Sequence, residues 1–240
     1  MAQTMTVQGT IEAVTLGFTS MHEHALYDGT VYSKRTEGKF PEDLPVKADD
    51  PVRLENIDLL QRNFTLSKDT CSMRDEEWMA AELAEFKESG GQTLVDQSPP
   101  GLRSDVLTIQ RISKRTGVHI ITTTSLYTED SWPDQFEGMS CDEYAMYMLN
   151  EIENGIGGSD VKPGAIKIAG LDLAEPQEKV LRAAGCVANE SGLMLTVHPG
   201  FDIGNDGRRI VKILREEDVN FERVVNAHGD GFFVSTNLKT

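Results

Sequence analysis

Residues 164–200 read GAIKIAGLDLAEPQEKVLRAAGCVANESGLMLTVHPG and contain one full repeat of strand, helix and strand. Short apolar runs predict strands at Gly164–Ile168 and Leu193–Val197. Between them, Pro176 suits the first turn of a helix, which we expect to end before Gly192. Short, nearly all-apolar strands joined by helical crossovers are typical of a parallel sheet that helices cover on both faces.

The same alternation extends over most of the chain. Further strands are expected at Thr15–Met21, Gln92–Val95, Val118–Thr124 and Val224–Ala227. Further helices are expected at Asp75–Ser89, Ser104–Thr116, 140–154 and Gly207–Glu217. Residues from about 25 to 70 are rich in Gly, Pro and charge, and they predict a long irregular insertion with one helix from Pro51 to about Leu66. We therefore expect a single α/β domain over residues 1–240, in which five of six strands are followed by a helical crossover.

The composition is that of a globular domain with an acidic surface. Of 240 residues, 39% are hydrophobic and 26% are charged, and the formal net charge is −16. Nucleic acids and anionic membranes both require a basic surface, so both are disfavoured as partners. No apolar run approaches the roughly 20 residues of a membrane helix, and the N-terminus lacks the apolar core of a secretory signal. Cys71, Cys141 and Cys186 are odd in number and far apart, which indicates reduced thiols in a cytoplasmic protein.

Four of the five histidines stand at the ends of expected strands: His22, His24, His198 and His228. Loops at the ends of parallel strands carry the chemistry of α/β folds, and histidine is the commonest metal ligand in proteins. His22 and His24 are two residues apart, so an extended backbone points both to the same side and can place both on one ion. A single histidine at a strand end is more often structural. His119 is such a case, because it lies near the start of its strand, at the opposite face.

Lys167 is the unusual residue of the apolar run AIKIA. A buried and unpaired lysine is costly, so we expect it to be neutral, paired or modified. A neutral lysine can react with carbon dioxide to give an anionic carbamate, whose two oxygens can bridge two cations. The alternative is a structural ion pair with a carboxylate inside the fold, such as Asp96.

Six stretches together resemble the phosphotriesterase-related family of the amidohydrolase superfamily. In chain order they are TVQGTI (6–11), LGFTSMHEH (16–24), LVDQSPPGLRSDVLTIQRISKRTGVHIITTTSLY (94–127), AIKIAG (165–170), LTVHPG (195–200) and VVNAHGD (224–230). MHEH alone is a weak signal. The succession of MHEH, IKIA, TVHPG and AHGD, each at a strand end, is specific and covers essentially the whole chain.

The resemblance implies a TIM (β/α)8-type barrel with a binuclear metal centre, and zinc is the expected metal. His22 and His24 would hold one divalent ion, and His198 and His228 would hold the other. Carboxylated Lys167 would bridge the two ions, with a hydroxide between them. This arrangement would make the protein a metal-dependent hydrolase that cleaves an ester, lactone or phosphotriester bond in a small-molecule substrate. Its ester or lactone substrate would lie in a pocket lined by Tyr127 and by residues 25–50.

The sequence also departs from the family pattern. An eight-stranded barrel needs two more strands than the sequence predicts, so the barrel is expected to be truncated after about six. The aspartate that the family carries on its last strand, where it accepts the proton of the attacking water, has no match. Asp230 suits a place beside the substrate better than direct ligation. Strands one and six would be left as open edges, which predicts poor solubility or self-association as a homo-oligomer.

Two functions therefore compete. The first is a metal-dependent hydrolase of the phosphotriesterase-related type. The alternative is a non-catalytic metal- or ligand-binding relative that lacks the last-strand aspartate. A dinucleotide-binding oxidoreductase is disfavoured, because no G-x-G-x-x-G sequence follows any expected strand.

Overall fold

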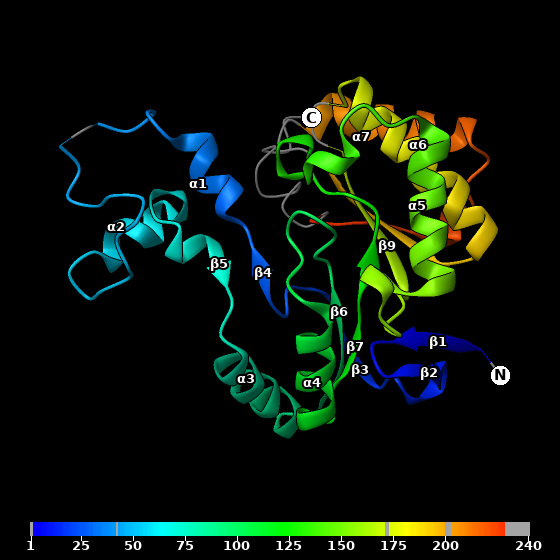
Figure 1. The fold of residues 1–240 in the computed structure, drawn as a ribbon, viewed down its shortest axis with the longest axis horizontal. Helices are drawn as coiled ribbons and strands as arrows, with labels where there is room; N and C mark the ends of the chain where they lie inside the picture. Colours follow the sequence, from blue (N-terminus) through cyan, green and yellow to red (C-terminus); the bar gives the residue numbers. More distant parts are fainter. Residues whose placement is uncertain (1, 42, 171–172, 200–202, 229–240) are drawn as a thin grey trace, which may run out of the picture.

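The computed structural model of the protein describes residues 2–41, 43–170, 173–199 and 203–228 (Figure 1). Its main strands are β3 (Phe18–Glu23), β6 (Gly91–Asp96), β7 (His119–Ile121), β8 (Thr123–Thr124), β9 (Ala165–Gly170), β10 (Met194–Pro199) and β11 (Val224–Asn226). They pair in the orders β3-β6-β7 and β8-β9-β10-β11, and every pair is parallel. Only Thr122 separates β7 from β8, so the described strands follow one another in chain order. This confirms the predicted barrel-type α/β fold.

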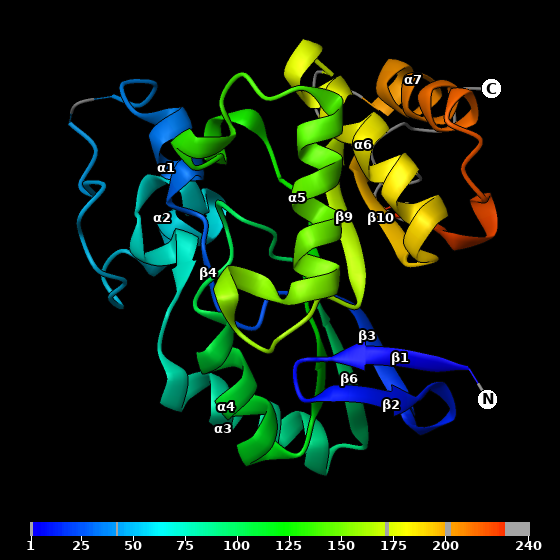
Figure 2. The same cartoon turned by 45° about the vertical axis from the view of Figure 1, so that its right-hand side comes forward.

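Helices alternate with these strands. They are α3 (Glu76–Glu88), α4 (Val106–Thr116), α5 (Cys141–Asn154), α6 (Glu175–Ser191) and α7 (Ile203–Glu216). Figure 2 shows α5, α6 and α7 lying along one side of β9 and β10. Short 3₁₀ turns occur at Ala13–Thr15, Phe64–Leu66, Asp69–Cys71, Glu129–Ser131, Asp134–Phe136, Ile156–Gly158 and Phe221–Arg223.

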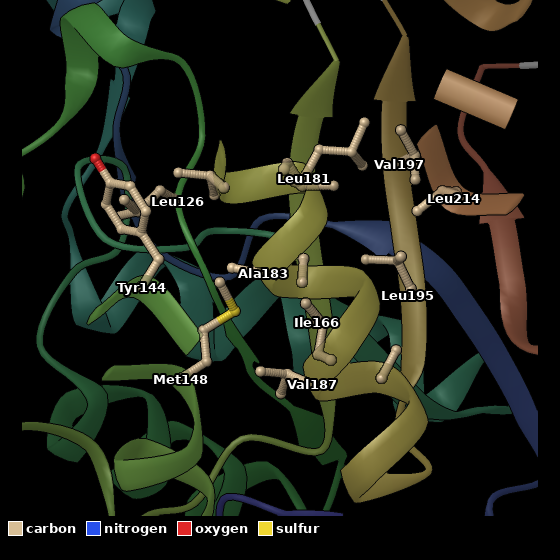
Figure 3. Packing of buried hydrophobic residues seen from close by; sticks show 14 of the residues in the cluster. Leu126, Tyr144, Met148, Ile166, Leu181, Ala183, Val187, Leu195, Val197 and Leu214 are labelled. Carbon is tan, nitrogen blue, oxygen red and sulfur yellow. The ribbon is translucent and has the colours of Figure 1, made fainter. Parts of the chain in front are cut away.

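The largest apolar core fills the space between these helices and the strands (Figure 3). Ile166 and Ile168 of β9 have no exposed surface and pack with Leu181 of α6 and Leu195 of β10. Each such side chain stabilises the fold by roughly 1.5–3 kcal/mol through burial. Because strand side chains alternate between faces, this packing turns Lys167 toward the opposite face, away from the helices.

The insertion after β3 is more ordered than predicted. It contains β4 (Tyr27–Asp28), α1 (Thr30–Thr36), α2 (Ile57–Arg62) and β5 (Ser72–Met73). The antiparallel pair of β4 and β5 joins its two ends, and α1 and α2 lie to one side of the sheet in Figure 1. The predicted helix Pro51–Leu66 is wrong in length, since Asn63 is extended and ends α2. The assignment of one domain over residues 1–240 stays a prediction.

A hairpin that the sequence did not predict precedes the sheet. It consists of β1 (Gln3–Thr6) and β2 (Gly9–Glu12), which pair antiparallel. The Val7 amide in its turn donates to the Ile120 carbonyl of β7 at 2.8 Å, and Gln110 Nε2 donates to the Val7 carbonyl at 2.8 Å. The hairpin is thereby fixed against β7 and α4.

Among the described strands, β3 and β11 are each paired on one side only. On β3, Phe18 is 68% exposed and Met21 is 45% exposed. Because an open edge with apolar side chains can pair with a second chain, we expect the purified protein to self-associate. Phe18→Lys should reduce this association in sedimentation velocity experiments, whereas Leu54→Lys, at an exposed site of the insertion, should not. A wild-type protein that sediments as a monomer at every concentration would contradict this expectation.

Candidate functional site

All five predicted ligands and Tyr127 line one cavity of about 470 Å³, together with Tyr32. The complete lining among the described residues is His22, His24, Tyr32, Tyr127, Lys167, His198 and His228. Asp230 lies outside the described residues. His119 begins β7 and does not line the cavity.

The strands bring these side chains together from distant parts of the sequence. His22 lies within β3, which runs to Glu23, and His24 follows that strand directly. In the parallel register of β9 and β10, Lys167 pairs with Thr196, so Lys167 lies two residues deeper in the sheet than His198. His228 follows β11 by two residues and has a positive φ of 56°. A lysine at the floor and imidazoles above it therefore form the cavity.

Three of the imidazoles form a compact group. Ligand nitrogens of His22, His198 and His228 all lie within 4.8 Å of one another. The ring centroids of His228 lie 4.7 Å from His22 and 4.6 Å from His198. Small side-chain movements would let all three nitrogens lie at the roughly 2.0–2.1 Å from a shared zinc ion that a zinc–nitrogen bond requires. The donor set thus fits a divalent cation.

This grouping places His22 beside His198 and His228, whereas the family resemblance pairs His22 with His24. The His24 ring centroid is 5.8 Å from that of His22, and its Nδ1 lies 2.8 Å from Ser98 Oγ. Only Nε2 of His24 is then left to act as a ligand. The pairing implied by the resemblance stays a prediction.

Three of the imidazoles are held neutral. Burial first, and then the positive charge of Lys167, lower the pKa of His22 and of His198 to about 3 and that of His24 to about 4. Neutral imidazoles carry the lone pairs that bind metal. The site is therefore ready to bind a cation at neutral pH without first losing protons.

Lys167 is 1% exposed, and its Nζ lies 3.3 Å from His22 Nε2. Burial lowers the pKa of this amine to about 7. The ion pair with Asp96 that the sequence left open is not present, and no other carboxylate pairs with Lys167 in the part of the chain that is described. Lys167 is thus a buried amine at the floor of the histidine cavity, without a carboxylate partner among the described residues.

Two tyrosines form the wall of the cavity on the side of the insertion. Tyr127 is buried, and its Oη lies 3.5 Å from His198 Nε2. Tyr32, on α1, meets Tyr127 edge to face with ring centroids 6.3 Å apart. Arg35 stacks on Tyr32 at 5.2 Å and hydrogen bonds to Asp130, which fastens α1 to the loop after β8. Spacing gave no signal for Tyr32, since its place depends on the packing of the insertion.

A second cavity, of about 850 Å³, adjoins the same two segments. Its lining includes Arg35 of α1, Thr128 and Trp132 after β8, and Gln177 of α6. Gln177 Nε2 donates to the Tyr127 carbonyl at 2.9 Å, so this side chain supports both cavities. The volume is in the range of small-molecule binding sites.

Buried polar atoms near the ends of β6, β7 and β8 lack hydrogen-bond partners among the described residues. They are Asp96 Oδ2, Gln97 Oε1, Thr122 Oγ1 and Ser125 Oγ. Ser125 also has a φ of 89°, which is strained for a residue other than glycine. Unsatisfied buried groups and strained backbone tend to collect at functional sites.

The neutral imidazoles predict loss of stability in acid. His22, His24 and His198 ordinarily have a pKa of 6.5 and are held near 3–4 by the fold, so unfolding takes up protons between about pH 3 and 6.5. For each proton taken up on unfolding, the free energy of unfolding decreases by about 1.4 kcal/mol when the pH falls by one unit. Burial raises the pKa of Asp96 from 3.8 to about 7, so between these pH values Asp96 releases a proton on unfolding. This release offsets part of the uptake by the histidines. The urea midpoint of the metal-free protein should fall between about pH 6.5 and 5; a constant midpoint would contradict neutral imidazoles.

Comparison with known proteins places the chain in a family. The sequence model of the phosphotriesterase family matches residues 2–239. The chain belongs to the phosphotriesterase family. Membership confirms the resemblance found in the sequence.

Two curated relatives match nearly the whole of this chain. The chain is 32% identical to a phosphotriesterase-related protein from Nematostella vectensis, over 96% of this chain and 65% of that protein. It is 29% identical to the human N-acetyltaurine hydrolase, over 94% of this chain and 64% of that protein. The chain thus spans less than two thirds of the length of these curated relatives.

Solved structures of phosphotriesterase relatives agree with the fold. A resiniferatoxin-binding protein from Rhodobacter sphaeroides superposes with a TM-score of 0.88 at 27% identity, over 97% of this chain and 64% of that one. A lactonase from Listeria monocytogenes superposes with a TM-score of 0.74 over 95% of this chain and 66% of that one, and its 21% identity supports the fold alone. None of the helices in the described ranges has the length and apolar character to cross a membrane.

Proposed function

We propose that this chain carries the site of a metal-dependent hydrolase of the phosphotriesterase-related type, acting on an ester, lactone or phosphotriester bond of a small molecule. The observation that carries the proposal is the convergence of five predicted ligands, from four separate strands, on one cavity. The name of one relative, an N-acetyltaurine hydrolase, adds acylated amines to the bonds worth testing.

In this proposal the cavity side chains would hold two divalent ions, with zinc as the expected metal. His22 and His24 would hold one ion, His198 and His228 would hold the other, and carboxylated Lys167 would be a ligand of both. When bound, such ions lower the pKa of a water molecule and polarise the C=O or P=O bond that is attacked. The imidazoles of His22, His24 and His198 contribute neutral nitrogen donors.

Lys167 supplies the bridge in carboxylated form. Its neutral amine adds to carbon dioxide, which forms one N–C bond and releases one proton, and the product is a carbamate with a single negative charge. The lowered pKa of about 7 keeps a substantial fraction of the amine neutral near pH 7. The carbamate also provides an anionic oxygen ligand for a cavity whose described lining contains no carboxylate.

The tyrosine wall and the second cavity position the substrate. Tyr127 and Tyr32 lie beside the histidines, so their rings contact the part of the substrate next to the reacting bond. The leaving group extends toward Arg35 and Trp132, where a further 850 Å³ is available. The four acidic side chains of that lining, Glu129, Asp130, Asp134 and Glu137, disfavour strongly anionic leaving groups.

The test is turnover after controlled metal loading. The protein is stripped with a chelator, reloaded with zinc in bicarbonate, and assayed on aryl esters, lactones, phosphotriesters and N-acetyl amines. We expect turnover of at least one class above that of free zinc, its loss on stripping, and its loss in His198→Asn. His119→Asn is the matched control and should retain activity, since His119 lies outside the cavity. Metal binding without turnover would favour the non-catalytic alternative.

A further inference from the structure

We propose that Ser98 and Asp96 are positioning residues that fix the ring orientation and the tautomer of His24. The proposal rests on the proposed function, because it assigns His24 Nε2 to metal binding. It concerns a chain of three groups, an imidazole, a hydroxyl and a carboxylate, that runs from the cavity into the interior behind it.

Strand register brings the three groups together. Glu23 of β3 pairs with Asp96 of β6, and the Gln97 amide donates to the Glu23 carbonyl at 2.8 Å. His24 and Ser98 are therefore the next residues to meet beyond these two strand ends. His24 Nδ1 lies 2.8 Å from Ser98 Oγ, which is the distance of a strong hydrogen bond.

Asp96 completes the chain on the far side of Ser98. Its side chain is fully buried, its Oδ1 accepts from the Ser98 amide at 3.2 Å, and the Ser98 side chain lies beside the same carboxylate. Its Oδ2 has no partner among the described residues. A buried carboxylate with an unsatisfied oxygen is costly, so its position beside Ser98 requires a reason.

In its ionised form the Asp96 side chain can only accept, and this gives the hydrogen bonds a direction. The Ser98 hydroxyl donates to Asp96 and accepts from Nδ1–H of His24, which leaves the lone pair of His24 on Nε2, the atom available to the cavity. A hydrogen-bond acceptor for the ring N–H that does not face the metal commonly fixes the tautomer of a metal-binding histidine. Loss of such an acceptor lowers metal affinity by about 10- to 100-fold. Without Ser98, nothing in the described surroundings holds the proton on Nδ1.

Two substitutions test this series of hydrogen bonds, one at its middle group, Ser98, and one at its inner end, Asp96. Ser98→Ala removes the acceptor of Nδ1–H. Asp96→Asn keeps the shape but offers an N–H to Ser98, so the hydroxyl then donates to His24 Nδ1 and shifts the ring proton to Nε2. Ser113→Ala is the matched control, since this buried serine of α4 donates to the Val118 carbonyl just before β7 and does not line the cavity.

The first readout is the tautomer of His24 in the metal-free protein, from long-range ¹H–¹⁵N NMR, with the His24 signals assigned by their loss in His24→Asn. We expect Nδ1–H in the wild type and in Ser113→Ala, and a shift toward Nε2–H in Ser98→Ala and Asp96→Asn. The second readout is zinc affinity, measured against a chromophoric chelator. Its Kd should rise about 10- to 100-fold in the two site variants and stay unchanged in the control.

Each result decides the matter. An Nδ1–H tautomer and a wild-type Kd in Ser98→Ala would overturn the proposal, and the same result in Asp96→Asn alone would remove Asp96 from it. Because the NMR readout requires neither metal nor substrate, a wild-type protein that fails to hydrolyse anything would refute the proposed function and leave the test of Ser98 and Asp96 intact.

Discussion

Replacement of Lys167 by alanine should reduce hydrolysis by about 10³-fold or more, which corresponds to about 4 kcal/mol of lost transition-state stabilisation. The substitution removes carboxylated Lys167, which is both the proposed bridge between the metal ions and the anionic ligand of the cavity. We expect zinc content to fall below two ions per chain when measured by mass spectrometry. Activity at the wild-type level would show that Lys167 has no part in the reaction.

Lys167→Met separates this role from a structural one. Methionine keeps the length of the side chain and removes the amine, which is 1% exposed and has His22 Nε2 at 3.3 Å as its nearest polar partner. Because burial of that amine is unfavourable, the metal-free variant should be at least as stable as the wild type in urea. A large loss of stability would instead show that the Lys167 amine has a structural role.

Glu151→Ala should lower the free energy of unfolding by about 3–5 kcal/mol, because it leaves the buried guanidinium of Arg103 without a counter-ion. The two side chains are 4% and 9% exposed and lie 2.7 Å apart. Glu151 also accepts from Thr124 Oγ1 and from Tyr147 Oη, both at 2.6 Å. The pair therefore joins α5 to β8 and to the loop after β6.

Urea unfolding measures this loss, and two variants control it. Glu77→Ala breaks the exposed pair with Arg115 and should leave the midpoint nearly unchanged. A double substitution, Arg103→Met with Glu151→Leu, removes both buried charges and should recover much of the stability that Glu151→Ala loses. If the double variant is as unstable as the single one, packing rather than uncompensated charge explains the effect.

The strand and helix alternation could be predicted because its signals are local. Apolar runs such as AIKIA, glycine stops such as Gly117 and Gly192, and the Ser140–Glu143 capping box all appear where the structure has the corresponding element. The insertion could not be predicted in the same way. Helix α1 has the sequence TVYSKRT, without an apolar period, and it is held by contacts such as Arg35 with Asp130.

The residues of the candidate site also differ in how far the sequence predicts them. Histidines at strand ends and a lysine within an apolar strand are visible in the sequence, and the structure brings them to one cavity. Tyr32 and Ser98 carry no such signal, because each reaches the site through an insertion or a strand register that the sequence does not specify. The cytoplasmic location and the state of Lys167 stay predictions.

The contact between His22 and His228 has a consequence for folding. The two rings lie 4.7 Å apart, although one comes from the first strand of the sheet and the other follows the last strand described. Contacts between residues so distant in sequence close a very long loop and form slowly. The histidine group is complete only when the intervening strands are paired as described. A cation bound there would join the first described strand to the last and would act as a cross-link that opposes unfolding from either end of the sheet.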